Sequence, residues 1–232
     1  MALKMYDLAA ADPLLRFSPY CWRTRMALAH KGLAVETVPW RFTEKDAIAF
    51  SGQGRVPVLL DGDKVVTDSW DIACYLDAAY PDRPALFGSA DARGAALFVK
   101  RWCEGQVHPA LVRLIIADIA RIVHPKDTGY FRESREKALG APLEAYVAAE
   151  EENLRHLHAV LTPLRLTVKD LAFLGGERPA YADYIVFGAL QWARCASPQT
   201  LLADDDPVAA WFGRLLDLYD GLGAKAPRAT AA

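Results

Sequence analysis

The tetrapeptide Ser18-Pro19-Tyr20-Cys21 places a hydroxyl, a helix-starting proline and a thiol within four residues. Serine is a favoured helix N-cap and proline is favoured at the first helical position, so a helix is expected to begin here. A helix N-terminus stabilises a neighbouring anion by ~0.3–1 kcal/mol, and a hydroxyl that donates to a thiolate adds about 1.5–3 kcal/mol. Since ~1.4 kcal/mol corresponds to one pKa unit, the two together could bring a bound thiol of pKa about 8.5 near neutrality. The thiolate is the nucleophile. A well-capped helix with no chemistry would use the same residues.

Two further segments carry polar groups beside a predicted helix or strand. Val56-Pro57 lies between the loop Gly52-Gln53-Gly54 and an apolar strand pattern. Asp68-Ser69 stands at the start of a predicted helix, where a carboxylate could accept from an ammonium group and donors could bind a carboxylate. Asp68 and Ser69 could equally serve only as a helix N-terminus.

The histidines and cysteines predict no metal centre and no disulfide framework. The five histidines form no recognisable catalytic set and are interpreted as structural or surface residues: His30, His108, His124, His156 and His158. The four cysteines lie far apart, contain no C-x-x-C pair and are expected to be reduced thiols.

The composition is that of a chain with a sizeable apolar core and nearly balanced charge. The 232 residues include 53% hydrophobic side chains, 27 basic and 29 acidic residues, for a net charge of −2. Charges of both signs are interleaved, which predicts neither a nucleic-acid groove nor a membrane-surface patch. No signal peptide is evident at Met1–Leu8, and Leu111–Val123 is too short and too charged to span a bilayer. We therefore expect a cytoplasmic protein with no membrane partner.

Residues 1–80 are expected to form an α/β unit with a mixed sheet. The predicted order is strand, helix, strand, short helix, hairpin and helix, at residues 3–8, 18–31, 35–38, 43–51, 56–67 and 68–79. Pro and Gly residues bound these segments, and apolar residues recur at strand or helix spacing within them. Tyr80-Pro81-Asp82-Arg83-Pro84 then breaks the pattern, so residues 81–90 are predicted to be a linker.

The remainder is expected to be all-helical, over residues 91–223. Apolar residues at spacings of three and four predict helices at residues 109–123, 143–161, 183–195 and 207–219. The alanine-rich tail, residues 224–232, is expected to be disordered.

Several motifs together resemble one enzyme family. Ser-Pro-Tyr-Cys is similar to the Cys-Pro-Tyr-Cys of glutaredoxins with serine at the attacking position, and Phe17–Arg23 resembles the active-site stretch of serine-type glutathione S-transferases. Arg55–Leu59 resembles that family's cis-proline loop, and Asp68-Ser69 resembles its acidic-Ser pair. Within the family, Ser-Pro-Tyr-x-Trp-Arg and Asp217–Gly223 are most similar to the bacterial β-etherase and related fungal branch.

The resemblance implies a thioredoxin-like α/β domain followed by an all-α helical bundle, with glutathione as cosubstrate and no covalently bound cofactor. Ser18 would hold the thiolate. The resemblance further implies a cis peptide bond before Pro57 and glutathione contacts from Arg41, Gln53, Arg55, Val56, Pro57, Asp68 and Ser69. An apolar electrophile pocket could be lined by Trp102, Val107, Leu111, Ile115 and Trp192, although such residues at helical spacing are also typical of a core. A homodimer is implied as well.

One position departs from the family pattern. Ala180 stands where the family usually has the Ser or Thr of a capping box, three residues before Asp183. The reciprocal side-chain bond cannot form, so Asp183 must find backbone donors in another way.

The expected activity is conjugation of the glutathione thiolate to a small apolar electrophile. Three alternatives remain open: a glutathione-dependent β-etherase or dehalogenase-type activity, a thiol-disulfide reductase, and a non-catalytic glutathione-binding stress-response protein. Ser18 at the attacking position argues against the reductase, which would need chemistry from Cys21.

Overall fold

The computed structural model describes residues 3–230, and within them the N-terminal third forms a mixed four-stranded sheet. The strands lie in the order β2-β1-β3-β4, with β1 parallel to β2 and antiparallel to β3. Their bounds are β1 Leu3–Leu8, β2 Val35–Trp40, β3 Val58–Asp61 and β4 Lys64–Thr67.

The strand predictions hold with small shifts at the ends. β2 continues two residues beyond the predicted Val38, and β3 begins two residues after the predicted start at Val56. The second shift has a plain cause, because the Val56-Pro57 peptide bond is cis and a proline offers no N–H to a ladder.

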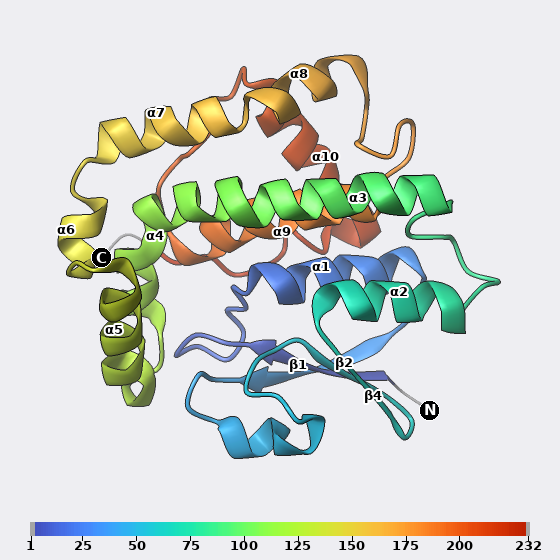
Figure 1. Ribbon diagram of the computed structural model, residues 1–232, viewed down its shortest axis with the longest axis horizontal. Helices are drawn as coiled ribbons and strands as arrows, with labels where there is room; N and C mark the ends of the chain where they lie inside the picture. The colour runs from blue at the N-terminus through green and yellow to red at the C-terminus, as the bar shows by residue number, and fades with distance from the viewer. Residues whose placement is uncertain (1–2, 231–232) are drawn as a thin grey trace.

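Two helices cover one face of the sheet, and a short 3-10 helix follows the second strand (Figure 1). These elements are α1 (Pro19–His30), α2 (Ser69–Ala79) and η1 (Lys45–Ser51). Figure 1 shows α1 and α2 lying between the sheet and the helices of the C-terminal domain. The predicted fold class, an α/β domain followed by an all-helical domain, is confirmed.

The C-terminal domain is a bundle in which α9 packs on α1. Its elements are α3 (Ala90–Trp102), η2 (Cys103–Val107), α4 (His108–Ile122), α5 (Pro125–Leu139), α6 (Leu143–Val147), α7 (Glu150–Val160), α8 (Thr162–Asp170), α9 (Tyr181–Ala196) and α10 (Pro207–Gly221). η2 is a π-helical turn that joins α3 to α4 without a break in helical backbone angles.

The predicted single helix over 143–161 is wrong, because it is divided between α6 and α7 at Ala148 and Ala149. Alanine favours helix, so propensity gives no sign of the break. The break places Glu150–Glu152 in the first turn of α7, where negative charge is stabilising. α6 can then pack on α4 and α5 independently of α7.

The tail expected to be disordered is packed against the helical domain as far as residue 230. The Ala229 N–H donates to Cys195 O at 2.9 Å, and Arg194 donates to Ala224 O at 3.0 Å. Both partners, Cys195 and Arg194, belong to α9, so the composition of the tail alone could not predict these contacts. Residues 231–232 of that prediction lie outside the described residues.

Gly188 allows α9 to approach the first turn of α1 closely. A Cβ atom at residue 188 would lie 2.4 Å from Pro19 O and 3.0 Å from Arg23 Cγ. Trp22 and Phe187 pack edge to face beside this contact, with ring centroids 6.2 Å apart. The glycine therefore helps to fix where the N-terminus of α1 lies.

Asp183 accepts hydrogen bonds from backbone N–H groups, as predicted from the absence of a capping-box Ser or Thr at residue 180. Its buried carboxylate accepts from the N–H groups of Leu174, Gly175 and Ala180 at 2.7–3.1 Å and from Trp211 Nε1 at 3.0 Å. It thereby joins the loop before α9 to α10, and the prediction is confirmed.

Candidate functional site

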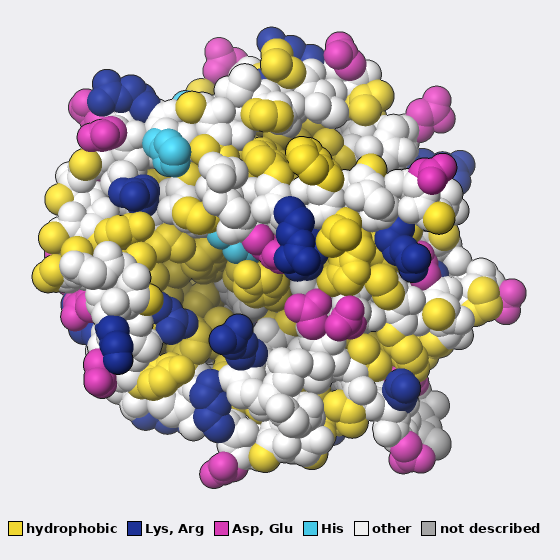
Figure 2. All heavy atoms as spheres, in the orientation of Figure 1, with side chains coloured by type: hydrophobic (Ala, Val, Ile, Leu, Met, Phe, Trp, Pro, Cys, Tyr) yellow, Lys and Arg dark blue, Asp and Glu magenta, His cyan; other side chains and the backbone are white. Residues whose placement is uncertain are grey.

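A cavity of about 710 Å³ opens between the N-terminus of α1 and the helices α4 and α5. Figure 2 shows it as a hollow on the left of the molecule, with an apolar interior and basic side chains along its lower rim. The carboxylate of Asp127 on α5 accepts from Phe42 N at 2.8 Å and from Thr43 N at 3.2 Å. These bonds hold α5 over the loop after β2 and so form one wall of the cavity.

Ser18 lies on this cavity at the N-cap of α1. Its Oγ accepts a hydrogen bond from Cys21 N at 3.2 Å, and the residue is 4% exposed. An oxygen that accepts from the backbone retains its own O–H proton for another acceptor. The same hydroxyl can therefore cap the helix and donate to an anion in the cavity.

Val56 and Arg55 also line the cavity, directly before the cis peptide bond to Pro57. The predicted cis isomer is confirmed. Of the two residues that this bond joins, Val56 lines the cavity, whereas Pro57 is buried and does not line it.

Asp68 and Ser69 lie at the start of α2, outside the lining of the cavity. Asp68 Oδ1 caps α2 by accepting from Trp70 N at 2.8 Å, and the residue has a left-handed φ of 66°. The Ser69 side chain is buried, and its Oγ has no hydrogen-bond partner among residues 3–230. The helix-cap interpretation is thus correct for Asp68, while the Ser69 hydroxyl retains unused hydrogen-bonding capacity.

The basic lining of the cavity differs in part from the prediction. Arg55 lines it together with Lys45 and Arg135. The Arg41 guanidinium instead donates to Ala10 O and Ala11 O at 3.3 and 3.2 Å.

Gln53 also lies outside the cavity lining. Its exposed side chain donates to Thr67 Oγ1 at 2.7 Å, which ties the glycine-rich loop to β4. Arg41 and Gln53 therefore brace loops around the cavity.

The predicted apolar wall is shifted by one helical position along α4. Val107, Leu111 and Ile115 are fully buried in the core, and Trp102 lies outside the lining, whereas Trp192 lines the cavity as predicted. The cavity is lined instead by His108, Val112, Ile116 and Ile119. Val107, Leu111 and Ile115 therefore belong to the core, the alternative that their helical spacing also allowed.

His108 was interpreted from sequence as a structural or surface residue, yet it lines the cavity. Its Nε2 lies 3.3 Å from Arg23 Nη2, and its ring is edge-on to Tyr20 and Trp192 at 5.4 and 5.7 Å. Burial, followed by the nearby Arg23 charge, lowers the pKa of His108 to about 3. The imidazole is therefore neutral over the physiological range.

Arg23 is fully buried and holds Glu104 on the cavity wall. Arg23 Nη1 lies 2.7 Å from Glu104 Oε1, and Lys100 Nζ lies 2.8 Å from the other carboxylate oxygen. Burial opposes ionisation of Glu104, but these two cations lower its pKa below the usual value.

The four cysteines are free thiols that lack the environment of a reactive thiolate. Burial and the neighbouring Asp7 carboxyl raise the pKa of Cys21 well above its usual range. Burial also raises the pKa of Cys103 to about 11 and that of Cys195 to about 12, and it raises the pKa of Cys74. A thiol with a raised pKa is a poor nucleophile at neutral pH.

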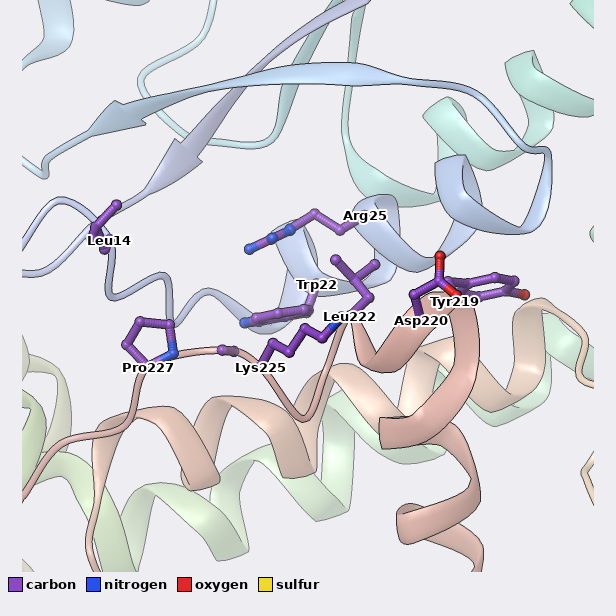
Figure 3. A pocket seen from close by; sticks show the side chains of 9 residues that line it. Leu14, Trp22, Arg25, Tyr219, Asp220, Leu222, Lys225 and Pro227 are labelled. Atoms are coloured by element: carbon purple, nitrogen blue, oxygen red, sulfur yellow. The ribbon is translucent and has the colours of Figure 1, made fainter.

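A second cavity, of about 330 Å³, lies beside Trp22 and the C-terminal segment (Figure 3). Arg25 and Lys225 line it together with apolar side chains that include Leu14 and Leu222. None of the predicted site residues borders it. The larger cavity is therefore the candidate site.

Among residues 3–230, no helix is long and apolar enough to cross a bilayer. In the same part of the chain, no three His, Cys, Asp or Glu side chains are grouped so that they could hold a metal ion.

Comparison with known families and proteins agrees with this geometry. The family model "Glutathione S-transferase, C-terminal domain" matches residues 95–218, more than half of the chain, and "Glutathione S-transferase, N-terminal domain" matches residues 17–79. The chain belongs to the glutathione S-transferase family, with a thioredoxin-like N-terminal domain and a helical C-terminal domain.

Two of the curated relatives match over part of the chain. Glutathione S-transferase Z1 of Arabidopsis thaliana is 42% identical over 69 residues, which cover 28% of this chain and 31% of the relative. The glutathione S-transferase-like protein ustS of Aspergillus flavus is 31% identical over 141 residues, which cover 54% of this chain and 49% of the relative. The chain thus spans from about a third to half of the length of these relatives.

Among solved structures, a glutathione S-transferase of Ceriporiopsis subvermispora, CsGST63524, in complex with glutathione, superposes with a TM-score of 0.82. It is 20% identical, and the alignment covers 99% of this chain and 100% of that one. At this identity the likeness concerns the fold.

Proposed function

We propose that this protein is a glutathione transferase that joins the glutathione sulfur to a small, largely apolar electrophile. The observation that carries the proposal is the place of Ser18, whose hydroxyl caps α1 and whose side chain borders a cavity lined by both basic and apolar residues. A thiolate placed there would accept a hydrogen bond from the Ser18 hydroxyl and face the partial positive charge of the helix N-terminus.

The rest of the cavity supports binding of a charged tripeptide. Lys45, Arg55 and Arg135 supply positive charge to a carboxylate, and the backbone of Val56 can pair with the central peptide unit. Asp68 and Ser69 would bind the γ-glutamyl end, Asp68 through the charge of its exposed carboxylate and Ser69 through its N–H group at the start of α2, since its hydroxyl is buried.

Turnover of 1-chloro-2,4-dinitrobenzene with glutathione tests the proposal. The wild-type protein is expected to release chloride and form the thioether. Ser18→Ala should slow this reaction at neutral pH while weakening glutathione affinity much less. Tight glutathione binding without turnover of any electrophile would favour the non-catalytic binding protein instead.

A β-etherase or dehalogenase-type reaction would use the same thiolate and differ in the bond broken. Asp217–Gly223 and the Ser-Pro-Tyr-x-Trp-Arg motif support placing the chain in that branch of the family. Release of a phenol from an aryl ether, compared with release of halide from an alkyl halide, distinguishes these activities. The buried, high-pKa Cys21 argues against a disulfide reductase.

We also propose a cytoplasmic homodimer, as the family resemblance implies. Light scattering of the purified protein tests the dimer, and a molar mass near that of one 25.5 kDa chain would contradict it.

A further inference from the structure

His108 is held in one tautomer by a buried arginine. The Arg23 guanidinium carries only donors, so His108 Nε2, 3.3 Å from Arg23 Nη2, must be the acceptor. The proton of the neutral ring is then on Nδ1. Arg23 itself is fixed by Glu104 Oε1 and by Ile185 O, which prevents it from turning away.

The protonated nitrogen is free to bind a molecule in the cavity. Nδ1 has no hydrogen-bond partner in the described part of the chain, and it is not one of the buried polar atoms sealed from solvent. The ring borders the same cavity as Ser18 and is packed edge-on between Tyr20 and Trp192. The ring thus presents one oriented N–H donor to the cavity, between the apolar residues of α4 and the Glu104 carboxylate that Arg23 and Lys100 neutralise.

We propose that His108 donates from Nδ1 to an oxygen of the electrophile, and that the site favours electrophiles whose oxygen gains negative charge during attack. This inference rests on the proposed transferase function. In an α,β-unsaturated ketone, the glutathione sulfur bonds to the β-carbon and the C=C electron pair moves toward the carbonyl oxygen, giving an enolate. His108 stabilises that oxygen and keeps its proton, and water supplies the proton that the α-carbon then takes.

The donor remains available across the physiological pH range. The charged and titratable groups around the ring are Arg23 and Tyr20 from α1, Glu104 from η2 and Lys100 from α3. Trp192 from α9 is uncharged. Burial and Arg23 lower the pKa of His108 to about 3, so kcat/KM should show no step attributable to this residue between pH 5 and 8.

Two electrophiles of similar size test the inference, one with an acceptor oxygen and one without. With 4-phenylbut-3-en-2-one, His108→Phe should lower kcat/KM by about tenfold or more, because removal of one donor to a developing oxyanion has effects of this order or larger. With benzyl chloride, where the C–S bond forms as chloride leaves, kcat/KM should change by less than about threefold. His156→Phe, a histidine on the exposed side of α7, is the matched control and should alter neither reaction.

Equal losses with both compounds, or no loss with either, would overturn the inference while leaving the transferase function intact. A wild-type protein that binds glutathione but turns over neither compound would refute the transferase function and the inference with it.

A second measurement needs no variant. A ¹⁵N–¹H correlation spectrum of the wild-type imidazole should show a protonated Nδ1 and an unprotonated Nε2. The Nδ1 resonance should shift when the unreactive ketone 4-phenylbutan-2-one is added with S-methylglutathione, and not when butylbenzene replaces the ketone. A protonated Nε2, or equal responses to both compounds, would overturn the assignment.

Discussion

Adding a methyl group at Gly188 tests whether the contact between α9 and α1 positions the site. The new Cβ would lie 2.4 Å from Pro19 O, in the first turn after Ser18. Non-bonded heavy atoms rest at ~3.5–4.0 Å, so one helix must move by about 1 Å. Overpacking of this kind costs ~1–3 kcal/mol, and the gain in helix propensity on replacing glycine, ~0.5–1 kcal/mol, offsets only part of it.

The displaced helix start should also impair function. A misplacement of about 1 Å can reduce a reaction rate by ~10²-fold. Urea unfolding measures the stability change, and kcat/KM with glutathione and chlorodinitrobenzene measures the functional one. Gly94→Ala in α3 is the matched control, since no neighbouring atom lies within 4 Å of the new Cβ. The Gly94→Ala variant should gain ~0.5–1 kcal/mol in free energy of unfolding and keep the wild-type kcat/KM. Equal stability and turnover in the two variants would refute the role given to Gly188.

Three further predictions follow from single contacts. Asp68→Asn keeps the helix cap and tolerates the left-handed backbone but removes the charge. Its melting temperature should be unchanged, while calorimetry should show a glutathione affinity at least ~10-fold weaker. An unchanged affinity would limit the role of Asp68 to capping α2. Asp183→Ala removes the buried acceptor of four donors, among them the buried Trp211 indole, and should cost ~1–3 kcal/mol or more in denaturant unfolding. A loss below ~1 kcal/mol would mean that water replaces the carboxylate. The pKa of His108 is about 3 in the folded state, against an ordinary 6.5, so below pH 6.5 the unfolded state binds a proton that the folded state does not. The free energy of unfolding should therefore fall as pH decreases from 6.5 toward 3, by ~1.4 kcal/mol per unit of pKa difference. The same decrease should be smaller in His108→Phe. An identical slope in the variant would contradict the assignment.

The sequence predicts well those features that depend on local residue types. Ser18-Pro19 starts α1 where capping preferences place it, and the strands of the hairpin follow their turn residues. The missing hydroxyl at Ala180 correctly indicates that Asp183 must bind backbone donors elsewhere, which are the N–H groups of Leu174 and Gly175.

Features that depend on distant partners could not be predicted. The break between α6 and α7 falls at two alanines, because packing on α4 and α5 overrides a strong helical preference. Arg41 and Arg135 cannot be distinguished by residue type, yet only Arg135 borders the cavity. Arg135 lies on α5, and the bond between Asp127 and the loop after β2 holds that helix beside the cavity.

The side of α4 that borders the cavity could not be identified from the sequence. Apolar residues at spacings of three and four identify the core side of α4 correctly, and Leu111 and Ile115 lie there. The cavity side carries His108, Val112 and Ile116, and only the packing of α4 against distant elements shows that this side faces an open space. The donor role inferred for His108 required Arg23, which is 85 residues away in the chain.

The pKa of the glutathione thiol in the complex tests the central claim most directly. Ultraviolet titration of the thiolate should give a bound pKa well below that of free glutathione. In Ser18→Ala it should rise by about 1–2 units, since a hydrogen bond to a charged group contributes ~1.5–3 kcal/mol. Ser89→Ala, which removes the equivalent N-cap from α3 away from the cavity, should leave the bound pKa unchanged. An unchanged pKa in Ser18→Ala would contradict the account and transfer thiolate stabilisation from this hydroxyl to the backbone amides.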